Sequence, residues 1–266
     1  MHASEREGLI IDVIAVNGFV TYRALEERLP ASPATIRRDL SRLEGQGRIV
    51  RVRGGAKLAE SANATAAAPY SFALSGLPFN ESLKRNLVQK RAIGRAAALL
   101  CRAGEGIMID GGTTTFQMCP HLDGLNLQVL TNSLHIVSAL LAQTDTRILV
   151  PAGAVFREQN IILAPAGDDS MPRFHAPKLF MGAAAIGRQG VMQADVVLVS
   201  AERRLIDRAE EVIVCVDSSK FGSSSGNVVC ELQEIDIVVT DEAVSEAAVA
   251  ELEEAGISVV IAVAKA

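Results

Sequence analysis

The chain has 266 residues, of which 49% are hydrophobic and 4% aromatic, with no Trp. That hydrophobic content excludes an intrinsically disordered chain, and so few aromatic rings argue against a protein that binds single-stranded nucleic acid by base stacking. We expect no signal peptide and no membrane span, and therefore a cytoplasmic protein. The four Cys residues form no CxxC pair, and neither a Walker motif nor GxGxxG occurs, so we expect no metal and no cofactor.

Basic residues are concentrated in the first 57 residues of the chain. This segment has ten Lys and Arg against seven Asp and Glu, whereas the remaining 209 residues have 16 against 24. A small basic segment on an acidic chain indicates a module that binds a polyanion, attached to a second domain.

Three helices are predicted within the basic segment. Ser4 caps the first helix, Thr21 caps the second, and Ser32-Pro33 begins the third, with a capping hydroxyl followed by Pro at the first helical position. In the third helix, one stripe is apolar and buried, and the opposite face carries Ala, Ser and Arg. Asp39 lies beside Thr35 and Arg42 on this helix, and we expect it to orient one of them.

The exposed face of the third helix suits the major groove of DNA. Small residues permit close approach, hydroxyls hold phosphates, and Arg reads guanine with two hydrogen bonds. Residues 48–57 then predict a short β-wing whose arginines meet the phosphate backbone. From the pattern alone, a generic three-helix subdomain with a solvated basic face remains an alternative. The residues predicted to contact double-stranded operator DNA are Thr21, Ser32, Thr35, Arg37, Arg38, Ser41, Arg42, Arg51 and Arg53.

Residues 58–80 contain no Lys or Arg and are rich in Ala and Ser, so we interpret them as a linker. The predicted domains are therefore a winged helix-turn-helix at 1–57, the linker at 58–80, and an α/β domain at 81–266. The last begins with a helix at 81–101. Helices are then predicted at 113–122, 133–143 and 245–255, and strands at 106–110, 127–131, 147–151, 178–182, 212–216, 235–240 and 258–263. Short Val and Ile runs between helices predict a mostly parallel, Rossmann-like sheet covered on both faces.

Polar residues follow several of these strands, at the edge where ligands of parallel sheets bind. Asp110 precedes two glycines and three threonines, Thr131-Asn132-Ser133 follows the next strand, and Lys220 lies beyond a later one. The predicted helix start after Gly112 offers N–H groups and a positive dipole end to an anion. Taken alone, the three threonines are equally consistent with simple helix capping.

Two sets of motifs resemble the DeoR family of bacterial transcriptional regulators. Arg6-x3-Ile10-x3-Ile14 and Ser32-Pro-Ala-Thr-Ile-Arg-Arg-Asp-Leu40, with the following wing, resemble its helix-turn-helix. The segments that resemble its C-terminal sensor domain are Gly94-Arg-Ala-Ala97, Asp110-Gly-Gly-Thr-Thr-Thr115, Leu130-Thr-Asn-Ser133, Lys178-Leu-Phe-Met-Gly-Ala183 and Asp217-Ser-Ser-Lys-Phe-Gly222. That sensor domain is related in fold to ribose-5-phosphate isomerase and binds sugar phosphates.

The resemblance implies a repressor of a carbohydrate-utilisation operon, controlled by a phosphorylated sugar or polyol. Operator symmetry adds the expectation of a homo-oligomer, at least a dimer. The stretch Ser200–Ile206 looks more like the branch that senses ascorbate 6-phosphate. The predicted effector-binding residues are Asp110, Gly112, Thr113, Thr114, Thr115, Thr131, Asn132, Ser133, Arg157, Asp195, Glu202 and Lys220.

A sugar-phosphate isomerase with an accessory DNA domain is the main alternative, and an inert oligomerising scaffold is a third. Isomerisation needs a base near the substrate carbon and a group that stabilises the enediolate. Asp110, Asp195, Glu202 and Lys220 supply those residue types. An enzyme has no use for an intact recognition helix and wing, so the first 57 residues favour the regulator.

Overall fold

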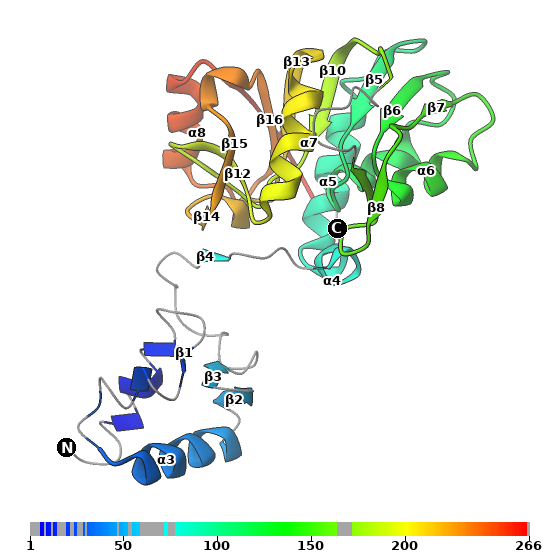
Figure 1. The fold of residues 1–266 in the computed structure, drawn as a ribbon. Coiled ribbons are helices and arrows are strands. Elements are labelled where there is room, and N and C mark those ends of the chain that lie inside the picture. The colour runs from blue at the N-terminus through cyan, green and yellow to red at the C-terminus, as the bar shows by residue number, and fades with distance from the viewer. Residues whose placement is uncertain are drawn as a thin grey trace. The chain divides into compact units, whose positions relative to one another are not determined.

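The chain divides into two compact units, Met1–Pro69 and Tyr70–Ala266, which are treated separately. A computed structural model describes residues 78–163 and 172–264 without interruption. Before residue 78 the described residues are 6–7, 9–11, 13–14, 20–21, 24–25, 29, 31–46, 48–52, 55–58 and 72–73. Figure 1 shows the elements of both units.

The N-terminal unit combines helices with a small antiparallel sheet. Its third helix, α3 (Pro33–Gly45), begins as predicted, with the Ser32 side chain accepting a hydrogen bond from the Thr35 N–H. The sheet has the order β1 (Val20–Thr21), β3 (Gly55–Leu58), β2 (Ile49–Val52), and its β2–β3 hairpin is the predicted wing. The buried core is formed by Ile10, Ile14, Val20, Leu25, Leu29, Ile36, Leu40, Leu43, Ile49 and Ala56.

The C-terminal unit is built on a seven-stranded sheet in which every neighbouring pair is parallel. This confirms the predicted α/β class. In spatial order its strands are β17 (Ser258–Ala262), β16 (Ile237–Asp241), β13 (Ala209–Cys215), β10 (Ala176–Met181), β5 (Gly106–Ile109), β6 (Gln128–Thr131) and β7 (Arg147–Leu149).

Helices cover both faces of this sheet, as the continuous apolar strands predict. Alternate strand residues belong to two separate cores, so that Met108 faces one and Ile107 the other. One core packs α5 (Leu87–Ala98), the 3₁₀ helix η2 (Thr115–His121) and α6 (Leu134–Leu140). The other packs α7 (Val196–Ile206) and α8 (Glu246–Glu254). None of the described helices is long and apolar enough to span a membrane.

Two predicted helices differ from the structure. The helix expected at 81–101 is broken into α4 (Phe79–Lys84) and α5, because Asn86 adopts a left-handed backbone with φ 50° and its side chain donates to Asp217 and Ser219. The helix expected at 113–122 is the shorter 3₁₀ helix η2, which contains Pro120. Proline removes a backbone donor and disfavours a regular α-helix.

Several short elements were not predicted from the sequence. Between β10 and β13 the chain forms β11 (Ala185–Gly187), β12 (Gly190–Gln193) and helix α7. β15 (Asn227–Cys230) follows β13 in the chain and completes an antiparallel sheet with β11 and β12. The hairpin β8–β9 spans Ala154–Phe156 and Ile161–Leu163, and β4 (Phe72–Ala73) pairs with β14 (Ser224–Ser225). Three of these elements, α7, β9 and β12, contribute residues to the cavity described below.

Candidate functional site

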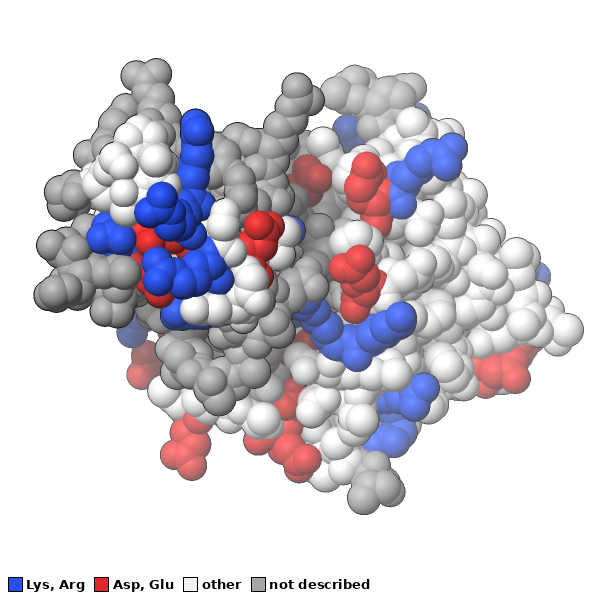
Figure 2. Space-filling view, turned by 90° about the horizontal axis from the view of Figure 1, so that it is seen from below, with Lys and Arg blue, Asp and Glu red and all other residues white. Residues whose placement is uncertain are grey.

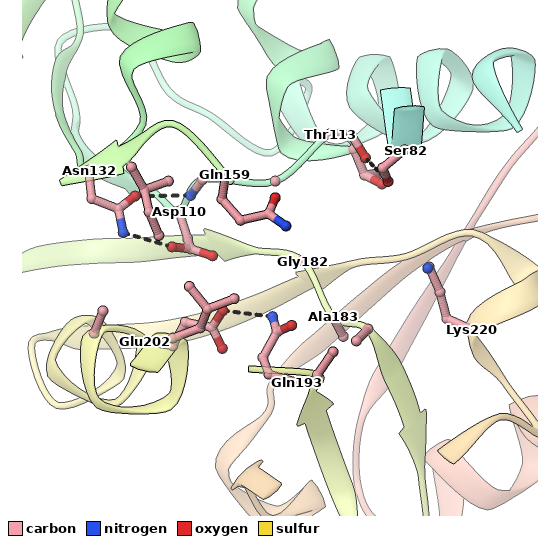
Figure 3. Close-up of a pocket in the computed structure, with 18 of the residues that line it drawn as sticks. Ser82, Asp110, Thr113, Asn132, Gln159, Gly182, Ala183, Gln193, Glu202 and Lys220 are labelled. Carbon is pink, nitrogen blue, oxygen red and sulfur yellow. Dashed lines mark hydrogen bonds between the residues drawn. The ribbon is translucent and has the colours of Figure 1, made fainter. Parts of the chain in front are cut away.

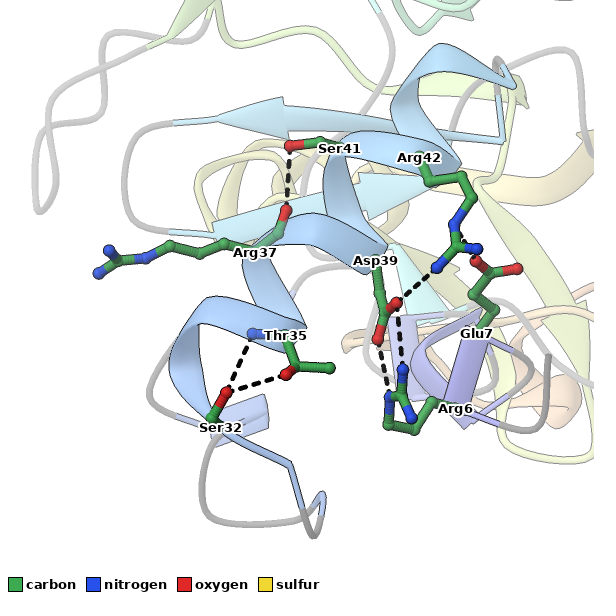
Figure 4. A network of polar contacts seen from close by, with 8 residues as sticks. All are labelled: Arg6, Glu7, Ser32, Thr35, Arg37, Asp39, Ser41 and Arg42. Atoms are coloured by element: carbon green, nitrogen blue, oxygen red, sulfur yellow. Dashed lines mark hydrogen bonds and ion pairs between the residues drawn. The ribbon is translucent and has the colours of Figure 1, made fainter. Parts of the chain in front are cut away.

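The outer face of α3 carries exposed arginines on a rigid helix. Arg37 and Arg38 are both exposed, and neither is held by an ion pair among the described residues. Figure 4 shows the Arg37 side chain extending away from the helix. Figure 2 shows Lys and Arg side chains gathered on the face of the N-terminal unit that carries α3. Guanidinium groups presented in this way can reach base edges and phosphates.

Asp39 fixes α3 to the first helical segment of the chain. It is 1% exposed, and its carboxylate accepts from Arg6 Nε at 2.8 Å and from Arg42 Nη2 at 2.8 Å. Arg42 also pairs with Glu7 at 2.7 Å (Figure 4). The prediction that Asp39 orients Arg42 is therefore confirmed. Because Arg42 is held by two acids, we infer that Arg42 positions the helix, and that Arg37 and Arg38 remain to contact DNA.

The other residues predicted to bind DNA serve mostly as caps or lie partly outside the description. The hydroxyl of Thr21 accepts from the Ala24 N–H at 3.1 Å, and that of Ser41 donates to the Arg37 carbonyl at 2.9 Å. The hydroxyls of Ser32 and Thr35 lie 2.8 Å apart at the start of α3. Arg51 is in β2, but its side chain lies outside the described part of the chain, as does the whole of Arg53.

In the C-terminal unit, a cavity of about 140 Å³ lies at the carboxyl ends of β5, β6 and β10. Polar groups line two sides of it, and the small residues Gly182 and Ala183 lie between them (Figure 3). The loop after β5 runs so close to β9 that a Cβ on Gly111 would lie 2.5 Å from Cγ2 of Ile161. Glycine at this position therefore lets the backbone form one wall of the cavity.

One side of the cavity is cationic. Lys90 is 2% exposed, and its ammonium group donates to the carbonyl of Ser82 at 2.6 Å. The pKa of Lys90 is lowered to about 8, mainly by burial and also by the charge of Lys220, against the opposing effect of Asp217. Lys220 also lines the cavity, and the hydroxyls of Ser82 and Thr113 lie 3.3 Å apart on this side (Figure 3). Two lysines on one side of a cavity, one of them buried, form a site that suits an anion.

The opposite side is acidic. Asp110 accepts a hydrogen bond from the side-chain amide of Asn132 at 3.1 Å, and Oε1 of Glu202 accepts from Gln193 at 2.6 Å (Figure 3). Burial raises the pKa of both carboxyls, and the nearby charge of Asp110 raises that of Glu202 further. Oε2 of Glu202 is buried and finds no hydrogen-bond partner in the part of the chain that the structure describes.

The structure brings seven of the twelve predicted effector-binding residues into the cavity lining. They are Asp110, Gly112, Thr113, Thr114, Asn132, Glu202 and Lys220. The expected supply of unpaired amides at the loop after β5 is reduced, because the N–H of Gly111 donates to Asn132 and that of Gly112 donates to the Thr115 hydroxyl.

The other five predicted residues do not line the cavity. The hydroxyls of Thr115, Thr131 and Ser133 are engaged with backbone groups, Ser133 as the cap of α6. Asp195 caps α7 by accepting from the Val197 N–H, and Arg157 is exposed between β8 and β9. Local hydrogen bonds of this kind are the common alternative use of Ser, Thr and Asp side chains.

The sequence analysis missed Lys90, Ser82 and Gln193. Lys90 had a visible signal, since it shares one helical face with Ile93 and Ala97 at i, i+3 and i+7, and all three are buried. A lysine on an apolar helix face is typical of a functional position, because burial of an ammonium is costly. Ser82 and Gln193 offered no such signal, because Ser82 lies in a predicted helix that breaks at Asn86 and Gln193 lies in β12, which was not predicted.

Comparison with known proteins identifies both units. The profile of the DeoR-like helix-turn-helix domain matches residues 6–62, and that of the DeoR C-terminal sensor domain matches residues 85–242. The chain belongs to the DeoR family. Among its relatives is the HTH-type transcriptional regulator UlaR of Shigella dysenteriae, 28% identical over 259 residues, which cover 97% of this chain and 99% of the relative. UlaR of Escherichia coli K12 matches with the same identity and coverage.

Two solved structures match about half of the chain at low TM-score. Ribose 5-phosphate isomerase A from Methanocaldococcus jannaschii matches with a TM-score of 0.36 and 15% identity, covering 53% of this chain and 55% of that one. Translation initiation factor eIF-2B from Pyrococcus horikoshii matches with a TM-score of 0.36 and 19% identity, covering 53% and 50%. The functional assignment comes from the family and its relatives: the chain is a transcriptional regulator, as predicted, and not an isomerase.

Proposed function

We propose that this regulator represses a carbohydrate-utilisation operon, and that a phosphorylated sugar or polyol bound in the cavity controls its affinity for DNA. The observation that supports a phosphorylated effector is the pair of lysines on one side of the cavity. Lys90 is buried, and among the residues that the structure describes its ammonium has one acceptor, the Ser82 carbonyl, although an ammonium has three protons to donate. A phosphate dianion between Lys90 and Lys220 supplies the missing acceptors and neutralises both charges.

The cavity is connected to the start of the C-terminal unit through α4. Ser82 is in α4, and Phe79 at its start stacks on His135 with ring centroids 3.9 Å apart. We propose that a phosphate competes with the Ser82 carbonyl for the Lys90 ammonium and thereby shifts α4. Because α4 follows the proposed linker in the sequence, we propose that such a shift is how effector binding alters the affinity for DNA.

We further propose that residues 1–57 and 81–266 are separate domains joined by the linker 58–80, and that the protein acts as a homo-oligomer, at least a dimer. The division between Pro69 and Tyr70 supports the first proposal. Limited proteolysis should cut between residues 58 and 80, and a chain protected there and cut elsewhere would contradict the boundary. Sedimentation velocity tests the second proposal, and a monomer at micromolar concentration would contradict it.

Isothermal titration with phosphorylated and unphosphorylated forms of five- and six-carbon sugars and polyols tests the effector. We expect binding of at least one phosphorylated form and far weaker binding of its unphosphorylated partner. Thr114→Glu places a carboxylate in the cavity, and Thr144→Glu, at an exposed position outside it, is the matched control. The Thr114 variant should bind a DNA duplex selected from a random library and ignore the effector. If that variant still responds to the effector, or if the phosphorylated and unphosphorylated forms bind equally well, then the effector does not bind through its phosphate in this cavity.

A further inference from the structure

The acidic side of the cavity has no cation to balance it. Asp110 and Glu202 are 5% and 3% exposed, and no salt bridge reaches either carboxyl from any residue that the structure describes. Burial of two carboxyls side by side is unfavourable unless one keeps its proton. Burial therefore favours a single negative charge on this side of the cavity.

The hydrogen bonds decide which carboxyl keeps the proton. The Asn132 amide donates to Asp110 and favours its anion, and the nearby Gly111 N–H, which itself donates to Asn132, likewise opposes the effect of burial on the pKa of Asp110. Glu202 receives a single hydrogen bond from Gln193, on Oε1, and its Oε2 has no partner within the described chain. The proton is therefore assigned to Oε2 of Glu202, where it makes that oxygen a donor without an acceptor.

An unsatisfied buried donor beside a carboxylate suits a hydroxyl group, which accepts one hydrogen bond and donates another. Lys220 lies across the cavity from the two carboxyls, beyond Gly182 and Ala183 (Figure 3), and Lys90 lines the same cavity. A phosphate at the lysines thus leaves the carbon chain of its ester directed toward the two carboxyls.

We propose that Glu202 and Asp110 form a hydroxyl-binding pair that reads the end of the effector remote from its phosphate, Glu202 as donor and Asp110 as acceptor. This inference rests on the proposed function and assigns two residues to the hydroxyl groups of its effector. The effector is a phosphate ester that carries hydroxyls at its far end, and phosphate alone or an alkyl phosphate lacks the groups that this pair recognises.

The test compares ligands that differ only in those hydroxyls. The full chain is titrated at pH 7 with ribitol 5-phosphate and n-pentyl phosphate, and with the six-carbon pair glucitol 6-phosphate and n-hexyl phosphate. We expect the polyol phosphate of at least one pair to bind about tenfold or more tightly than its alkyl counterpart, since two buried hydrogen bonds distinguish them. The variants are Glu202→Gln, which keeps a donor, Glu202→Met, which removes it, and Asp110→Leu, which removes the acceptor. Glu253→Gln, exposed on α8, is the control.

Glu202→Met and Asp110→Leu should weaken the polyol phosphate about tenfold and leave the alkyl phosphate unchanged, whereas Glu202→Gln should retain most of the discrimination. A merely structural role would weaken both ligands together. Equal wild-type affinity for the two ligands of each pair, or unchanged discrimination in Glu202→Met, would overturn the pair and leave the phosphate site standing. If no phosphate ester binds at all, the proposed function fails and this inference fails with it. Should Glu202→Met not fold, Glu202→Gln and the wild-type comparison still decide.

Discussion

Asp39 in the DNA-binding unit and Glu202 in the sensor unit are both almost completely buried, yet their surroundings differ. Asp39 accepts hydrogen bonds from two arginines, so its charge is matched within the chain. Glu202 has one amide donor, an anionic neighbour and an oxygen without a partner in the described chain. A buried carboxylate whose charge the fold satisfies is a structural element, whereas a buried carboxyl left unsatisfied costs stability and is a candidate for ligand binding.

If Asp39 is structural, removing it should have the largest effect on stability. Asp39→Ala leaves Arg6 without its buried partner and separates α3 from the first helical segment. We expect the N-terminal unit to lose about 3 kcal/mol of unfolding free energy, the lower end for a broken buried ion pair, because both arginines keep some contact with water. Thermal unfolding followed by circular dichroism checks this, with the exposed Asp123→Ala in the other unit as control. Unchanged stability would show that the network is not needed for the fold.

Arg38 on α3 and Arg53 in the predicted wing should affect DNA binding and not stability. Arg38→Ala should lower affinity for a duplex selected from a random library by about 1–3 kcal/mol and relax its sequence preference, because a bidentate contact to a base is lost. Arg53→Ala, in the predicted wing, should weaken selected and scrambled duplexes alike and reduce the salt dependence by about one phosphate contact. Gel-shift titrations at two salt concentrations separate the two effects. If Arg38→Ala bound both duplexes like the wild type, α3 would not lie in the groove.

The same contrast explains what could be predicted from the sequence. The helix start at Ser32-Pro33, the hairpin and the parallel strands were predicted because local propensity and periodicity determine them. Asp110, Thr114 and Lys220 were found because they follow buried strands. Lys90 was not predicted to line the cavity. The break at Asn86 that precedes α5 depends on contacts with Asp217 and Ser219, more than a hundred positions away in the chain.

Thr131 and Ser133 show the opposite limitation. Their position after β6 resembles that of the residues that line the cavity, but their hydroxyls are engaged with backbone N–H groups of the same turn. Strand-end position therefore identifies the correct edge of the sheet without saying which side chains turn toward the ligand and which close the local hydrogen bonds.

Within the sensor unit, the lysine side of the cavity provides a third test. Lys90→Met keeps much of the buried volume and removes the ammonium, so affinity for n-pentyl phosphate should fall at least about tenfold, the loss typical of a charge-assisted hydrogen bond. In the wild type, phosphate affinity should decrease as the pH rises through about 8, where Lys90 loses its proton. The variant should lose that part of the pH dependence. Lys84→Met, exposed on α4, is the control, and equal effects of the two substitutions would exclude Lys90 from the site.

The smallest expected effect concerns the stability of the empty sensor unit. The pKa of Glu202 is raised in the folded chain by burial and by Asp110, so the native state retains a proton that the unfolded state releases near its ordinary pKa of about 4.3. Stability must then fall as the pH rises from that value to the folded pKa, because over this range the native state binds more protons than the unfolded state. Glu202→Gln cannot ionise and should lack this loss.

The variant and the wild type should therefore have similar melting temperatures near pH 5, with the difference growing toward pH 8. A gain of roughly 2–4 °C corresponds to about 1 kcal/mol in a unit of this size. Differential scanning calorimetry without ligand, between pH 5 and 8.5, measures the difference, and Glu253→Gln should follow the wild type throughout. If Glu202→Gln is more stable at pH 8 and still distinguishes the polyol phosphate from the alkyl phosphate, then the ionisable carboxyl lowers stability, and the hydrogen-bond donor at this position is what recognises the ligand. A variant less stable than the wild type at pH 8 would mean that the ionised carboxylate is satisfied in the fold, as Asp39 is, and the contrast between the two acids would disappear.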